Sequence, residues 1–168
     1  MPRLLLRCLL FVGALALAGS AVAAPAVDLV GYYRMPANSL VRPAQEGVVV
    51  VAVYRCATDE FCGRIAARGG LPDADLHNPE PVSRARSLCG LDILAVEIPL
   101  GARDAALKGN LYDPRTGGDS AVELYAGSNG DLHITEQPTP SSASARLEEV
   151  WQRVTPPASS CDRPSSIS

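Results

Sequence analysis

The sequence predicts a mainly β domain of about eight antiparallel strands, folded as a sandwich or a closed barrel. Short runs rich in β-branched, aromatic and other apolar residues follow one another along the 168-residue chain. Glycine, proline or an Asn-Gly pair separates most of these runs, as in the turns of antiparallel sheets. Almost no segment has the apolar spacing of a helix. These three observations together indicate an all-β fold.

The first three strands are expected in the half of the chain that precedes a long polar segment. Leu29–Arg34 begins the fold, and Val48–Cys56 is apolar on both faces, as in a strand that is covered on both sides. Phe61–Arg68 lies just beyond a short polar connection. We therefore expect the second and third strands to form a hairpin.

Two further strands are marked by the prolines that end them. Leu91–Ile98 is stopped by Pro99, and Lys108–Asp113 is stopped by Pro114. The residues Arg115–Gly118 have the composition of a turn.

The last three strands follow that turn. Ala121–Tyr125 alternates between apolar and polar residues, and so does Leu132–Thr135. Between them lies the hairpin turn Ser128–Gly130, in which Asn-Gly tolerates positive φ. Arg146–Val154 completes the set. His133 is expected to face outward, with no evident partner, and adjacent Glu148 and Glu149 to point to opposite faces.

The other segments are short or polar. A helical turn is expected near Ser83–Leu88, a polar linker at Thr139–Ala145, and a flexible Pro/Ser-rich tail at Thr155–Ser168. The predicted domain organisation is a signal peptide over residues 1–23, one β domain over 24–154, and the tail over 155–168.

The N-terminus predicts export. Arg3 and Arg7 accompany an apolar run, and Ala21-Val22-Ala23 matches the small-x-small pattern that signal peptidase cleaves. The alternative is an uncleaved anchor, because the uncharged run is about long enough to span a membrane. The cleavage pattern favours removal after Ala23. The expected location is periplasmic or secreted, with no membrane span after processing.

Charge excludes two classes of partner. The chain has 15 basic and 18 acidic residues, a formal net charge of −3, and the predicted cleavage removes two of the arginines. Such a chain lacks the basic surface that binds nucleic acid or an anionic membrane.

Four cysteines remain after the predicted cleavage, and four cysteines allow three pairings. Cys56 and Cys62 flank the expected hairpin connection, so we predict a disulfide between them. Cys89 and Cys161 are then predicted to form a second disulfide that fastens the tail. Zinc is disfavoured because the spacings contain no C-x-x-C pair and no histidine lies near a cysteine. No metal and no cofactor is predicted.

The polar segment between the third and fourth strands is the candidate site, because long polar loops in compact domains are uncommon and often functional. Arginine presents a planar fork to carboxylates and phosphates, so the loop could bind an anionic or polar ligand. Alternatively, its aspartates and asparagine form turns while Arg84 and Arg86 pair with Asp75 and Asp113 to clamp the crossover to the domain. The candidate residues for these two roles are Asp75, His77, Asn78, Arg84, Arg86 and Asp113.

The order of several short motifs resembles a known family. The pieces are Cys62-Gly63-Arg64-Ile65, Asp75 with Asn78-Pro79, Arg84-x-Arg86-x-Leu88-x-Gly90-Leu91, Gly109, Leu111-Tyr112-Asp113-Pro114, Gly117 and Trp151-x-Arg153. Over about Val30 to Val154 the chain is similar to the exported bacterial proteins grouped as domain of unknown function 2147. The resemblance implies a small lipocalin-like β-barrel rather than a sandwich. The chain departs from that family near its start, where Tyr32 or Tyr33 takes the place of a tryptophan.

Three functions remain compatible with the sequence. The first is a non-catalytic module of the cell envelope that binds a small ligand inside or at the end of its barrel. The second is a structural or protein-interaction module whose barrel is filled by side chains. The third is a hydrolase or isomerase that uses Asp75, His77 and Arg84. The expected partner is accordingly an unknown small molecule or an envelope protein.

Overall fold

The computed structural model describes residues 28–36, 48–99, 106–137 and 148–158, together with Cys161. The predicted signal peptide, the linker and most of the tail lie outside the described residues. No helix within the described ranges is long and apolar enough to cross a membrane.

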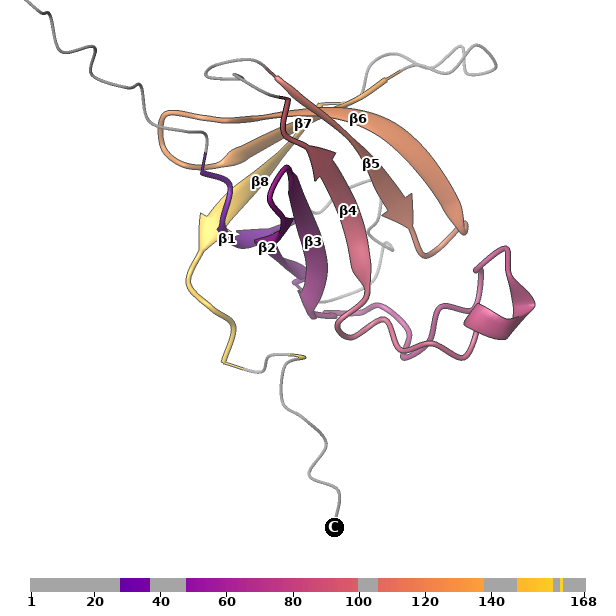
Figure 1. Ribbon diagram of the computed structural model, residues 1–168. Coiled ribbons are helices and arrows are strands. Elements are labelled where there is room, and N and C mark those ends of the chain that lie inside the picture. The colour runs from indigo at the N-terminus through magenta and orange to yellow at the C-terminus, as the bar shows by residue number, and fades with distance from the viewer. Residues whose placement is uncertain (1–27, 37–47, 100–105, 138–147, 159–160, 162–168) are drawn as a thin grey trace, which may run out of the picture.

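Eight antiparallel strands form a closed barrel in which each strand pairs with the next and the last pairs with the first (Figure 1). The prediction of a mainly β barrel is confirmed, and the sandwich alternative is excluded. The strands are β1 (Gly31–Arg34), β2 (Val50–Ala57), β3 (Glu60–Ala67), β4 (Asp92–Glu97), β5 (Leu107–Asp113), β6 (Gly118–Ala126), β7 (Leu132–Glu136) and β8 (Glu148–Val154).

Two local expectations are corrected. The helical turn is a 3-10 turn at Pro81–Ser83 and not at Ser83–Leu88, because proline is well suited to the first position of such a turn. Strand β6 begins at Gly118, three residues earlier than expected, because Gly118 and Asp119 pair with the end of β5.

The interior of the barrel is apolar. Alternate residues of each strand point inward, and the fully buried ones of β2, β6 and β7 are valine, leucine and isoleucine. The largest fully buried side chains include Trp151, Tyr33 and Phe61. Burial of such side chains contributes roughly 1.5–3 kcal/mol each, so the lumen is the main source of stability.

One end of the barrel, where β8 finishes and β1 begins, is closed by the segment before β1. Leu29 is fully buried there, and its carbonyl accepts a hydrogen bond from the Tyr33 hydroxyl at 3.0 Å. The guanidinium of Arg153 lies over the Tyr33 ring and donates to the carbonyl oxygen of Val30. We call the opposite end, where β1, β3, β5 and β7 finish, the loop end.

Both predicted disulfides are present. Cys56 and Cys62 are joined across the β2–β3 hairpin, with Cα atoms 5.6 Å apart. Cys89 is joined to Cys161, whose backbone N–H donates to the carbonyl of Ala66 at the end of β3. The second bond therefore holds the chain beyond β8 against β3 and the long loop. Structural disulfides are typical of proteins in oxidising compartments.

Candidate functional site

The centre of the polar loop is Asp75, whose side chain is fully buried. Its carboxylate accepts hydrogen bonds from Tyr112 Oη at 2.7 Å, Asn78 Nδ2 at 2.8 Å and Arg86 Nη2 at 3.1 Å. Tyr112 belongs to β5, whereas the other two donors belong to the loop. Asp75 therefore joins the loop to the wall of the barrel.

The loop backbone forms a narrow stalk with a turn at its tip (Figure 1). The Asp75 N–H donates to the Arg86 carbonyl, and the Leu88 N–H donates to the Asp73 carbonyl. Asn78 then turns the chain, because its side-chain oxygen accepts from the Glu80 N–H. The buried carboxylate thus lies within a loop that is bonded along both of its arms.

The six predicted site residues do not form one cluster in the structure. Arg86 pairs with Asp75 as the clamp hypothesis expected. Arg84 pairs with no carboxylate among the described residues, and its Nε donates to the Asn78 carbonyl at 2.9 Å. Asp113 does not meet the loop arginines either, because Arg115 lies two residues away and binds it at 2.8 Å. The His77 side chain is exposed, and its backbone carbonyl lies against Gly117 of the β5–β6 turn.

The pKa values of Asp75 and Tyr112 are shifted in opposite directions. Burial alone would raise the pKa of Asp75, but the hydrogen bonds from Asn78, Tyr112 and Arg86 outweigh it and hold the pKa below the usual range of an aspartate. Burial, together with the hydrogen bond to Asp75, raises the pKa of Tyr112 to about 12. Both shifts favour the observed state, a neutral tyrosine that donates to a carboxylate.

Alkaline pH should therefore loosen the loop. A raised pKa means that the folded state holds the Tyr112 proton more tightly than the unfolded chain does, where the pKa is about 10. This stabilisation is complete below pH ~10 and is lost as the pH rises through the folded pKa of about 12. Urea unfolding across this window should show a smaller loss of stability for Tyr112→Phe than for the wild type. An identical pH dependence of the two proteins would contradict the assignment.

A second polar group lies inside the barrel. Glu149 is only 4% exposed although its neighbours Glu148 and Val150 face solvent. Its Oε2 accepts a hydrogen bond from the indole Nε1 of fully buried Trp151 at 2.8 Å. The alternation of side chains along a strand predicted that Glu148 and Glu149 point to opposite faces. It did not predict that Glu149 would be the one that points into the barrel.

Polar side chains continue from Glu149 to the loop end. Ser120 of β6 and Glu136 of β7 alternate with buried residues of their strands and so face inward, and they are joined by a hydrogen bond of 2.6 Å. Glu136 lies two residues beyond Ile134, the cross-strand partner of Glu149. Both Ser120 and Glu136 are half-buried, so water reaches this part of the lumen. We call Ser120, Glu136, Glu149 and Trp151 the lumen row.

His133 lies on the outside of the barrel, as expected, but the prediction that it lacks a partner is wrong. Its ring stacks on Tyr125 with centroids 4.5 Å apart, and its Nδ1 lies 3.4 Å from Glu148 Oε1. The pairing of β6 with β7 and of β7 with β8 places these residues side by side.

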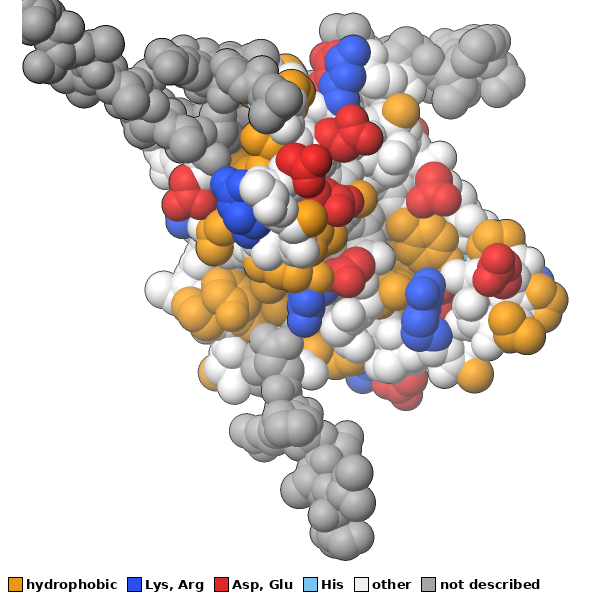
Figure 2. All heavy atoms as spheres, viewed as in Figure 1, with side chains coloured by type: hydrophobic (Ala, Val, Ile, Leu, Met, Phe, Trp, Pro, Cys, Tyr) orange, Lys and Arg blue, Asp and Glu red, His pale blue; other side chains and the backbone are white. Residues whose placement is uncertain are grey.

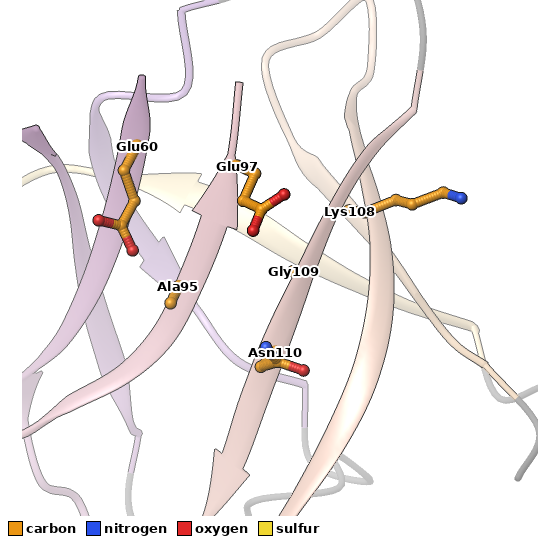
Figure 3. Close-up of a pocket in the computed structure, with 6 residues that line it drawn as sticks. All are labelled: Glu60, Ala95, Glu97, Lys108, Gly109 and Asn110. Carbon is orange, nitrogen blue, oxygen red and sulfur yellow. The ribbon is translucent and has the colours of Figure 1, made fainter. Parts of the chain in front are cut away.

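A shallow hollow of about 220 Å³ lies on the outer surface between β3, β4 and β5. Figure 2 shows acidic side chains gathered over β3 and β4 in the centre of the view. The carboxylates of Glu60 and Glu97 border the hollow, while Lys108 is directed away from them (Figure 3). Glu60 and Glu97 are direct cross-strand partners, an arrangement that is unfavourable for two like charges.

Comparisons with known proteins support the fold. Protein HP1028 of Helicobacter pylori, described as belonging to the lipocalin family, has a similar structure with a TM-score of 0.61. It is 24% identical, and the match covers 77% of this chain and 84% of that one. No family model and no curated protein matches the sequence. The likeness establishes a lipocalin-like barrel and leaves the activity open.

Proposed function

We propose that this protein is a non-catalytic, exported barrel that binds a small ligand at the loop end of its lumen. The observation that carries this proposal is Glu149, a carboxylate buried in an otherwise apolar interior. This carboxylate is bonded to Trp151 and lies at the inner end of a row of polar side chains that leads to the loop end. A binding site needs a few polar groups that orient the ligand against apolar walls.

The geometry restricts where a ligand would lie. The inner half of the lumen is filled by large side chains, with Trp151 and Phe61 fully buried. Exposure then increases along the lumen row, from Trp151 through Glu149 to Glu136 and Ser120. The ligand would therefore sit at the end of the barrel rather than in its centre, with its polar part near Glu136 and Glu149. Barrels of this size accommodate one small ligand.

The second candidate is an interaction module with a filled barrel. Its support is the same set of inward side chains, which leave the lumen tightly packed over most of its length. An enzyme built on the loop has less support, because Asp75 is buried and bonded to three side chains while the His77 side chain is exposed.

We propose a role in the cell envelope on the export signal that the sequence predicts, and the two disulfides support it. The resemblance to the domain of unknown function 2147 family also supports a role in the cell envelope. We propose membership of that family because the chain carries the ordered motifs from Cys62-Gly63 to Trp151-x-Arg153.

Native mass spectrometry of the protein isolated from the compartment to which it is exported tests the proposal. We expect a retained small molecule in the wild type and in Glu148→Gln, which changes the outward neighbour on the same strand. Glu149→Gln keeps the shape of the side chain but removes its charge, so it should weaken retention by at least about tenfold, the loss expected for a hydrogen bond to a charged group. Circular dichroism should show all three proteins folded. Equal retention by Glu149→Gln, or no small molecule in the wild type, would favour the filled-barrel alternative.

A further inference from the structure

The β2–β3 hairpin brings three potential metal ligands together on the outside of the barrel. Among the described residues, the sulfur atoms of Cys56 and Cys62 and a carboxylate oxygen of Glu60 lie within 4.8 Å of one another. Cys56 is exposed, and the other two side chains are half-buried. These three residues are called the hairpin triad.

The local fold explains this grouping. Glu60 and Cys62 are two residues apart on β3, so their side chains point to the same face. A register shift between Arg55 and Ala57 moves Cys56 toward the same place from β2. A bulge of this kind re-aims a side chain, and the paired strands on either side hold it in position.

In the oxidised protein the two sulfur atoms share a covalent bond and are poor metal ligands. A dithiol reductant changes this by exchange: it transfers two electrons and two protons to the Cys56–Cys62 bond, which becomes two thiols, and the reductant leaves as a cyclic disulfide. The two thiols can then release two protons to the solvent as a divalent cation binds both sulfur atoms as thiolates.

The dimensions of the hairpin suit a zinc-like ion. Such an ion binds thiolate sulfur at about 2.3 Å and carboxylate oxygen at about 2.0–2.2 Å, with tetrahedral angles. Ligand atoms that lie within 4.8 Å of one another need only small side-chain rotations to reach that arrangement. The fourth position would be taken by water, or by Glu97, which is the cross-strand partner of Glu60.

Charge provides a reason for the cation to bind there. Glu60 and Glu97 already oppose each other across the strands, and neither belongs to an ion pair within the part of the chain that the structure describes. Reduction adds two thiolates beside them, so the reduced hairpin concentrates negative charge over the hollow shown in Figure 3. A divalent cation removes most of that repulsion.

We propose that the reduced hairpin triad is a binding site for a thiophilic divalent cation such as Zn²⁺, with the thiolates of Cys56 and Cys62 and the carboxylate of Glu60 as ligands. Metal binding and disulfide formation then exclude each other. The hairpin exists either as a disulfide or as a metal complex, according to whether a reductant and the ion are present.

Equilibrium dialysis of the full chain against Zn²⁺, with and without a phosphine reductant that does not itself chelate the ion, tests this site. The reduced wild type should bind one more Zn²⁺ than the double variant Cys56→Ser/Cys62→Ser, whereas the two should bind equally when oxidised. Glu60→Gln should weaken binding to the reduced protein by at least about tenfold, because second-sphere changes alone cost that much. Glu123→Gln, on the outer face of β6, is the matched control and should bind as the wild type does.

A second measurement does not depend on the stability of the variants. Reoxidation of the reduced wild type, followed by thiol labelling and peptide mapping, should form the Cys56–Cys62 bond more slowly in the presence of Zn²⁺. An unchanged rate, or equal zinc binding by the reduced wild type and the double serine variant, would overturn the proposal.

Discussion

Asp75→Ala is expected to lower the free energy of unfolding by about 4 kcal/mol, because two hydrogen-bond donors lose their acceptor and each such loss costs roughly 1–3 kcal/mol. The substitution removes the acceptor of the Tyr112 hydroxyl and of the buried Asn78 amide. It also removes the contact through which the loop is held to β5. Urea denaturation monitored by circular dichroism measures the change.

Asp73→Ala is the matched control for this prediction. Asp73 belongs to the same loop and forms an ion pair with Arg68, but its side chain is 90% exposed. Exposed ion pairs contribute about 0–1 kcal/mol, so this variant should be almost as stable as the wild type. If the two alanine variants unfold at the same urea concentration, Asp75 does not stabilise the loop in the way described here.

Gly117→Ala is expected to cost about 3 kcal/mol, from two effects that act at the same residue. Gly117 has φ +72°, a conformation that costs roughly 1–2 kcal/mol for a residue with a Cβ. A Cβ at this position would also lie 1.9 Å from the backbone carbonyl oxygen of His77. Neither backbone can yield freely, because the β5–β6 turn and the polar loop are packed together there, and overpacking costs roughly 1–3 kcal/mol.

Gly90→Ala separates these two effects. Gly90 has a similar φ of +78°, but no atom lies within 4 Å of the position its Cβ would occupy. This variant should therefore show only the conformational cost, roughly 1–2 kcal/mol. Equal thermal stability of the two variants would mean that the contact between Gly117 and the loop contributes nothing.

Local sequence patterns predicted the strands that form the barrel. Every expected strand is present, because each is bounded by residues that end pairing, such as Pro114, or that favour a hairpin turn, such as Asn129-Gly130. Closure of the strands into a barrel did not follow from these patterns, since a sandwich uses the same strands and turns. That choice depends on the pairing of β1 with β8, which are far apart in the sequence.

The candidate site was predicted only in part. Asp75, Asn78 and Arg86 lie close together in the chain, and turn chemistry and charge identified them. Tyr112 was named only within a family motif and was not assigned to the site, because it comes from β5 and meets Asp75 only once the loop folds back on the barrel. Asp113 likewise binds Arg115 rather than the loop arginines, because Arg115 is only two residues away.

By itself the sequence determined the strands, the turns, the Cys56–Cys62 disulfide and the polar character of the long loop, because each depends on residues and spacings that local chemistry explains. Tertiary structure decided which face of β8 points inward. Alternation places Glu148 and Glu149 on opposite faces, and only closure of the barrel turned Glu149 into the lumen beside Trp151. The register of β3 against β4 brought Glu97 beside Glu60, since cross-strand neighbours are set by register and not by position along the chain.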